Sequence, residues 1–302
     1  MKELDACLGL FRAKAKVSTG ADIAGISQAE EVLELSFPTL LKEILKVTDG
    51  VVDSKGNSLL WSTSQILSKN QFLRTDSTVR QKYMPLNRFL FFSDAPCNGC
   101  FGFAIVPDSK LTASIFHWKG VNDSRESVSY HLSRFYEDLL DDREWLKRRS
   151  DPGGWEMSTA GLEALKPKIE KYWTTFPPVS ESEIQAVEAQ LGLILPDDLR
   201  QIYLYSNGID SEYGQAVYKL QELVPENALI KAQQFESDWV MPADSFLFFA
   251  PEGNGDYYAF PITEAGVGKA VMELEHEDDS RSYAAPDIFN LLDYQLEEYD
   301  EY

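Results

Sequence analysis

The sequence predicts an α+β protein that contains two tandem copies of one domain. Residues 26–50 align without a gap with residues 184–208, and eight of the 25 positions are identical. The string Phe-Leu-Phe-Phe occurs at residues 89–92 and again at 246–249, about half the chain apart. In each copy, segments with helical spacing precede segments typical of strands, which is the order of an α+β domain.

A third repeated block fixes the extent of the duplication. Asp-Ser-Arg occurs at 123–125 and at 279–281, an offset of 156 that is close to the 158 and 157 of the other two blocks. Between the copies, residues 148–154 read RRSDPGG, a polar segment with the Pro and Gly composition of a linker. We therefore predict a first domain over residues 1–149, a linker over 150–158 and a second domain over 159–302.

Each copy is expected to begin with a helix. In the second copy, Ile184 and Val187 lie at helical spacing, and the preceding segment 180–183, Ser-Glu-Ser-Glu, has the pattern of a capping box. In the first copy, either Asp22 or Ser27 is the candidate cap. The helix is therefore predicted in both copies, with a defined start only in the second.

A second helix follows in each copy. Pro196 opens it where a missing N–H costs nothing, and Asp197 and Asp198 lie in the first turn, where the helix dipole favours acids. The pair Asn207-Gly208 is expected to end this helix, since glycine enters the left-handed conformation without steric cost. Asp49-Gly50 takes the same place in the first copy.

Strands are expected after the helices. Four consecutive large apolar residues in each Phe-Leu-Phe-Phe string favour a central strand that is covered on both faces. The Asn-Gly that follows is a hairpin signal. Each copy is therefore predicted to form a mostly antiparallel sheet followed by a C-terminal helix. The expected strands also include short runs at 59–61 and 216–218, return strands CFGFAIV and DYYAFPI, and further strands TASIFHW and AVMEL. The expected C-terminal helices are HLSRFYEDLL and IFNLLDYQLEEY.

Charge is distributed unevenly between the two copies. Residues 1–150 contain 20 Lys and Arg against 19 Asp and Glu, whereas residues 151–302 contain 8 against 30, so the second half carries the whole net charge of −21. Repulsion between like charges argues against nucleic acid or an anionic membrane as a partner of that half and favours a basic protein. Acids that serve only solubility remain the alternative.

Compartment and redox state follow from what the chain lacks. The first residues do not have the pattern of a signal peptide, and no apolar run approaches the ~18 residues that a membrane-spanning helix needs. Three cysteines, Cys7, Cys97 and Cys100, are too few for a disulfide framework. We expect a soluble cytoplasmic protein.

The sequence offers little support for a catalytic site or a metal site. His117, His131 and His276 accompany no nucleophile motif, and the Gly266–Lys269 segment lacks the length of a phosphate-binding loop. Cys97–Cys100 has CxxC spacing, but a structural zinc site needs four ligands, so a hairpin turn is the favoured interpretation. No catalytic residue, cofactor or metal is therefore predicted, and zinc at the CxxC pair stays open.

The densest acidic run, residues 273–279, is the candidate binding site. Placed on a strand, Glu273, Glu275 and Glu277 would point to one face. Calcium loops need an Asp-x-Asp-x-Asp-Gly order that is absent here. Acids interleaved with tyrosines indicate a binding face more than a solubilising one. The predicted partner-binding residues are Glu252, Asp256, Tyr257, Tyr258, Glu273, Glu275, Glu277, Asp278 and Asp279.

The residues also carry a resemblance to a known family. Glu188, Pro196 and Asn207-Gly208, followed by Phe-Leu-Phe-Phe and Gly-Asn-Gly-Asp, resemble the pattern of the SUKH superfamily, Smi/Knr type. The resemblance covers nearly all of 160–302 and, more weakly, 1–147. In the first copy, Phe37 replaces the Leu before Pro, Asp49 replaces Asn, and Cys97–Cys100 replaces Gly-Asn-Gly-Asp.

The resemblance implies a non-enzymatic binding fold. Bacteria use it mainly in immunity proteins that neutralise toxins, and fungi use it in a regulator of cell-wall synthesis. The expectation is a protein of two SUKH-like domains, most simply an immunity protein that occludes a basic toxin domain such as a nuclease. A scaffold or regulatory adaptor of the fungal type is the alternative.

Overall fold

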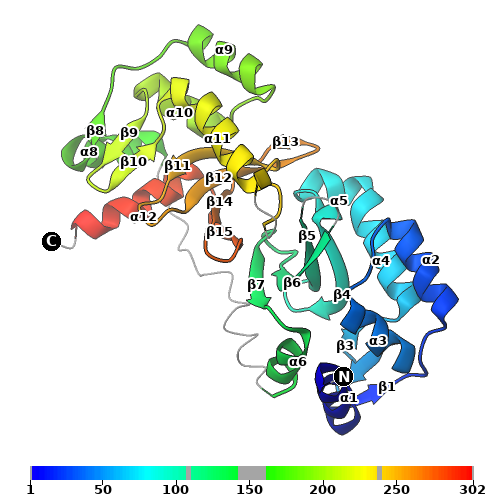
Figure 1. Ribbon diagram of the computed structural model, residues 1–302. Helices are drawn as coiled ribbons and strands as arrows, with labels where there is room; N and C mark the ends of the chain where they lie inside the picture. The colour runs from blue at the N-terminus through cyan, green and yellow to red at the C-terminus, as the bar shows by residue number, and fades with distance from the viewer. Residues whose placement is uncertain (1, 107–109, 142–160, 237–239, 301–302) are drawn as a thin grey trace. The chain divides into compact units, whose positions relative to one another are not determined.

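The computed structural model describes residues 2–106, 110–141, 161–236 and 240–300 (Figure 1). The chain divides into two compact units, one formed mainly by the first of the two copies and the other mainly by the second. The predicted linker at 150–158 lies outside the described residues, and the boundaries at 149 and 159 stay a prediction. In the described part of the chain, every helix is too short or too polar to cross a membrane.

The first domain has helices before the sheet and a helix after it, as predicted. Its short strands pair antiparallel in the order β1-β2-β3, and its main strands in the order β4-β5-β6-β7. The elements are α1 (Lys2–Lys14), β1 (Ala15–Val17), α2 (Ile23–Leu33), α3 (Thr39–Val47), β2 (Val51–Asp53), β3 (Ser58–Leu60), α4 (Thr63–Thr75), α5 (Ser77–Lys82), η1 (Leu86–Arg88), β4 (Phe89–Ala95), β5 (Gly99–Val106), β6 (Lys110–Trp118), β7 (Arg125–Ser129) and α6 (Leu132–Asp141).

The second domain repeats this order. Its short strands pair as β10-β9-β8 and its main strands as β11-β12-β14-β15, all antiparallel, with β13 added to β12. The elements are α8 (Leu162–Tyr172), β8 (Thr174–Thr175), α9 (Glu181–Leu191), α10 (Asp197–Tyr205), β9 (Ile209–Ser211), β10 (Gly214–Val217), η3 (Leu220–Glu222), α11 (Leu223–Glu236), β11 (Phe246–Pro251), β12 (Tyr257–Thr263), β13 (Gly266–Val267), β14 (Val271–Leu274), β15 (Arg281–Ala285) and α12 (Ile288–Asp300).

Helix starts agree with the sequence better than helix ends. Ser180 caps α9 through a capping box, and Asp22, not Ser27, caps α2. Pro196 is the N-cap of α10 rather than its first residue. The predicted end at Asn207-Gly208 was wrong, because α10 ends at Tyr205, where the next residue is already extended. Gly208 has the predicted positive φ of 83°, but in the loop before β9.

The second Phe-Leu-Phe-Phe strand, β11, lies between two cores. In β11, Leu247 and Phe249 join the large core formed with α8, α9, α10 and α12, whereas Phe246 and Phe248 join a smaller cluster that includes Ile230 of α11. Both faces are covered, as predicted. The predicted central position was wrong, because β4 and β11 are the terminal strands of their ladders, each with one β-strand partner.

A buried side chain completes the hydrogen bonding of each terminal strand. The Asn227 amide accepts from Phe248 N at 2.9 Å and donates to Phe248 O at 2.8 Å. Tyr218 N donates to Phe249 O at 2.8 Å. The edge is thereby satisfied without another strand, which explains why it can be buried. Asn70, Trp61, Phe91 and Phe92 make the same contacts in the first domain.

The repeated Asp-Ser-Arg block forms a buried ion pair. In the second domain, Arg281 donates to Asp279 at 3.0 Å and to Pro242 O at 3.2 Å, and its guanidinium lies over the Phe246 ring. Both charged side chains are nearly inaccessible, so each depends on the other for compensation. Asp123, Arg125, Pro85 and Phe89 repeat this arrangement in the first domain.

Candidate functional site

The hairpin turn between β11 and β12 is held by Asp256. Its carboxylate accepts hydrogen bonds from Asn254 Nδ2 at 2.8 Å and, at Oδ1, from His276 N at 2.7 Å. The same oxygen lies 2.6 Å from His276 Nδ1, and this contact with Asp256 is the main cause that raises the pKa of His276. Asp256 is buried and connects this turn to the turn after β14, which makes it a positioning residue of the site.

Three carboxylates meet beside that turn. Glu252, Asp256 and Glu273 each place one oxygen within 4.8 Å of the others, and Tyr258 donates its hydroxyl to Glu252 Oε1 at 3.1 Å. Burial raises the pKa of Glu273 to about 8, with further contributions from the hydrogen bond and the charge of Glu252. Near neutral pH Glu273 therefore retains its proton. Oxygen ligands as close together as these three are also a set that hard divalent cations accept.

The predicted acidic face on one strand was wrong. Strand β14 ends at Leu274, so only Glu273 is on it, where it pairs with Tyr258. The chain turns directly afterwards, because Glu275 N donates to Ser280 O at 2.9 Å and Asp279 takes a left-handed φ of 61°.

The nine predicted residues therefore differ in accessibility. Asp256, Tyr258 and Asp279 are buried, and Asp279 is committed to the ion pair with Arg281. Glu277 is exposed. Those of intermediate exposure are Glu252, Tyr257, Glu273, Glu275 and Asp278.

The first domain has no carboxylates at the corresponding strand positions. Ladder register places Ala95 and Gly99 where the second domain has Glu252 and Asp256, so the sequence alignment that put Cys100 at the Asp256 position was wrong by one residue. His117, opposite Phe101, takes the place of Glu273, opposite Tyr258. The His117 and Phe101 rings pack at 5.0 Å between centroids, so this position is filled by aromatic contacts.

A tyrosine-rich pocket of about 700 Å³ lies next to the three carboxylates in the second domain. We call it the tyrosine pocket. It is bounded by the ends of α8 and α12, the β9–β10 hairpin and the β11–β12 turn. The sequence analysis singled out two of the residues that line it, Glu252 and Tyr258, and missed four aromatic ones, Trp173, Tyr213, Tyr294 and Tyr299.

The aromatic walls of the tyrosine pocket are unevenly exposed. Trp173 is only 7% exposed, and its Nε1 lies near the Tyr299 hydroxyl without reaching ordinary hydrogen-bond geometry. Tyr172 stacks on Tyr299 with ring centroids 5.2 Å apart. At the rim, Tyr213 and Tyr294 are 73% and 51% exposed. The pocket therefore has a fixed floor and accessible aromatic edges.

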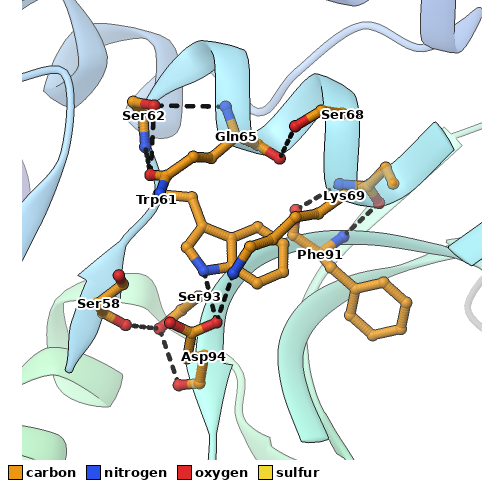
Figure 2. Close-up of polar contacts among 10 residues, drawn as sticks. Ser58, Trp61, Ser62, Gln65, Ser68, Lys69, Phe91, Ser93 and Asp94 are labelled. Atoms are coloured by element: carbon orange, nitrogen blue, oxygen red, sulfur yellow. Dashed lines mark hydrogen bonds and ion pairs between the residues drawn. The ribbon is translucent and has the colours of Figure 1, made fainter. Parts of the chain in front are cut away.

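At the edge of β4 in the first domain, a lysine side chain lies against an aromatic ring and a carboxylate of the same domain (Figure 2). Lys69 Nζ lies 4.2 Å from the centroid of the Trp61 ring and 2.8 Å from Asp94 Oδ1, which also accepts from Trp61 Nε1 at 2.9 Å. Counting from the matched asparagines Asn70 and Asn227, the residue at the Lys69 position in the second domain is Glu226.

The CxxC pair lies in the first domain's hairpin turn. Cys97 and Asn98 both have positive φ, and neither Cys97 nor Cys100, which are of intermediate exposure, is in a disulfide. Burial raises the pKa of Cys100 to about 12, which disfavours the thiolate that zinc binding and redox chemistry require. His117 Nε2 lies 3.3 Å from Pro96 O.

Comparison with known families assigns both domains. Residues 178–293 match the SMI1 / KNR4 family (SUKH-1), and residues 24–135 match the family described as SMI1-KNR4 cell-wall (SUKH_6). No curated protein matches the chain. The two matches fall on the two copies of the repeat and together cover most of the sequence. The chain therefore belongs to the SUKH superfamily, as two SUKH domains in tandem.

Proposed function

We propose that the protein acts by binding a basic protein partner through its second domain, without catalysis. The observation that supports this proposal most is the charge asymmetry, with 30 acids against 8 bases after residue 150. In the same domain three carboxylates lie close together beside one turn, with exposed tyrosines next to them. A field of this sign accelerates capture of a basic partner, as inhibitors of basic nucleases require. The function that fits best is that of a cytoplasmic immunity protein that occludes a basic toxin domain.

One observation favours a second candidate. The family that matches the first domain is described by its relation to the cell wall. This supports a scaffold or regulatory adaptor, with the first domain as a separate contact surface. The two candidates differ in the number of partners, because an immunity protein needs one and an adaptor needs several.

The experiment is affinity capture by the full chain from its own cells, followed by mass spectrometry. The bait is compared with a variant in which three exposed acids of the second domain, Glu264, Glu277 and Glu297, are reversed to Lys. One basic protein captured by the native chain and lost by the variant is the expected result. Several proteins whose capture is retained by the variant would contradict the immunity function and favour the adaptor.

A matched control separates site from net charge. Reversing Glu3, Asp5 and Glu31 in the first domain changes the formal charge equally and also uses exposed acids. We expect this control to retain the partner, with an association rate that falls as salt rises, because screening shortens the Debye length from ~10 Å at 0.1 M to ~3 Å at 1 M. Equal loss in both variants, or a rate indifferent to salt, would show that the acids serve solubility.

A further inference from the structure

We propose that the tyrosine pocket of the second domain is the receptor for an arginine side chain of the partner. This inference rests on the proposed function, since it names the group by which a basic partner would be anchored. It also goes beyond charge attraction, because it assigns one pocket and one chemical group. A guanidinium combines a positive charge, a planar face for aromatic rings and paired N–H donors for a carboxylate.

The electrostatics of the pocket favour a cation. Among the described residues that line it, Glu252 is the ionisable acid, and neither Lys, Arg nor His is present. Glu252 Oε1 accepts the Tyr258 hydroxyl, and the Glu252 carboxylate also shares a hydrogen bond with Glu273, so both of its neighbours are neutral or acidic groups. A bound guanidinium would supply the cation that the described lining residues lack and would donate charge-assisted hydrogen bonds to this carboxylate.

The neighbouring carboxylates act in the same direction. Glu273 and Asp256 lie within 4.8 Å of Glu252, and the proton that Glu273 retains near neutral pH offsets part of their repulsion. A guanidinium in the pocket would offset the same repulsion with a full positive charge. Binding is therefore stabilised by more than one acid, although only Glu252 lines the pocket.

The aromatic walls and the size of the pocket specify the group further. Trp173, Tyr258 and Tyr299 form its inner surface, and Tyr213 and Tyr294 its exposed rim. Cations placed over the faces of such rings are attracted to them, and more strongly where water is excluded. The volume of about 700 Å³ far exceeds that of a metal ion and suits a long side chain with part of its backbone.

The first domain shows the same recognition with an internal cation. There, Lys69 lies over the Trp61 ring and is paired with Asp94. Glu226, which takes the Lys69 position in the second domain, is not among the described residues that line the tyrosine pocket, so the first domain illustrates the chemistry of such a contact and not its location.

The test uses the full chain and two tripeptides, acetyl-Gly-Arg-Gly-amide and its citrulline counterpart, which has the same shape without the charge. The readout is the indole N–H signal of Trp173 in a ¹⁵N-labelled chain, identified with the variant Trp173→Phe. We expect the arginine peptide to shift this signal in a saturable way and to bind about tenfold more tightly than the citrulline peptide, equivalent to ~1.4 kcal/mol.

Two variants make the test specific. Glu252→Gln keeps the shape of the side chain and should weaken the arginine peptide about tenfold, the same ~1.4 kcal/mol. Glu163→Gln removes one charge from an acid of the same domain that is 86% exposed, and it should leave the affinity unchanged. Unchanged indole signals of the remaining tryptophans show that each variant is folded.

The outcomes separate this inference from the proposed function. Equal binding of the two peptides, equal binding by Glu252→Gln, or displacement of the arginine peptide by millimolar Mg²⁺ or Ca²⁺ would each overturn the arginine pocket. If the captured partner is lost with the Glu264, Glu277 and Glu297 reversal but retained by Glu252→Gln, the proposed function stands and the pocket assignment fails. If no basic partner is captured while the arginine peptide binds, the proposed function fails and the pocket assignment stands.

Discussion

The two domains use the same strand positions for different purposes. At the β4–β5 turn the first domain has Ala95 and Gly99, with His117 packed on Phe101 beside them, whereas the second domain places Glu252, Asp256 and Glu273 at the corresponding positions. The residues that satisfy the buried strand edges and the Asp-Arg pairs are, in contrast, the same in both. The framework has therefore been retained after the duplication, whereas the site has diverged.

The largest expected effect tests the shared framework. Arg281→Met leaves Asp279 buried without its partner and should destabilise the second domain by about 3–5 kcal/mol. Arg125→Met should do the same in the first domain. Urea denaturation with hydrogen exchange of each domain measures both. The double variant Asp279→Asn/Arg281→Met should recover much of the loss, and equal damage by the double variant would contradict an ion-pair origin.

Removing the edge-strand asparagine comes next. Asn227→Ala leaves both Phe248 N and Phe248 O without a partner in a buried place, and each such group costs ~1–3 kcal/mol. Asn70→Ala should cost a similar amount in the first domain. Thermal unfolding of the two variants gives the comparison. A large effect in only one domain would show that the two edges are not equivalent.

A smaller effect is expected at Gly208. With φ at 83°, a side chain there is strained, and its Cβ would lie 2.9 Å from Val217 O, so Gly208→Val should lower stability by about 1–2 kcal/mol. The first-domain counterpart Gly50 has more room, with the nearest atom at 3.5 Å, and Gly50→Val should cost less. An unchanged Tm for the Gly208 variant would remove the argument from backbone strain.

The last effect is a pH dependence confined to the second domain. The pKa of Glu273 is raised from 4.5 to about 8 in the folded chain, so between these values the folded state binds more protons than the unfolded state. Stability contributed by the protonated group is therefore present below pH 4.5 and is lost as pH rises towards 8. Glu273→Gln should raise Tm above pH 8 and change it little below pH 4.5.

The control for that dependence is Glu277→Gln, at an exposed position of the same acidic run. Its Tm difference from the native chain should stay constant over the same pH range. If both variants gain stability equally at high pH, general charge repulsion in the acidic domain is the cause, and the three-carboxylate cluster has no special part in it.

The sequence predicted the parts of the fold that depend on local chemistry. The repeat, the capping box at Ser180 and the hairpins follow from neighbouring residues, and the structure has them. The edge position of β11 could not be read from Phe-Leu-Phe-Phe, because an edge covered by a side chain is as apolar as a central strand. The signal that was available is spacing: Asn70 and Asn227 each precede their Phe-Leu-Phe-Phe string by 19 residues.

The candidate site was only half predictable. Its acids form a run that stands out, but the alternation assumed for Glu273, Glu275 and Glu277 failed because the strand ends at Leu274. The helices α1, α4, α5, α8 and α11 were not predicted either. Trp173 and Tyr299 meet in one pocket from positions far apart in the chain, so no local pattern indicates that they belong together.

The asparagine amide at the edge of each sheet has a consequence for how a duplicated chain folds. Two nearly identical apolar strands in one polypeptide can exchange partners, and an open edge on either invites pairing with a second molecule. Asn70 and Asn227 occupy the backbone groups of Phe91 and Phe248 that such an intruding strand would need. One side chain per domain thus closes the edge through which such strand exchange or intermolecular pairing would begin.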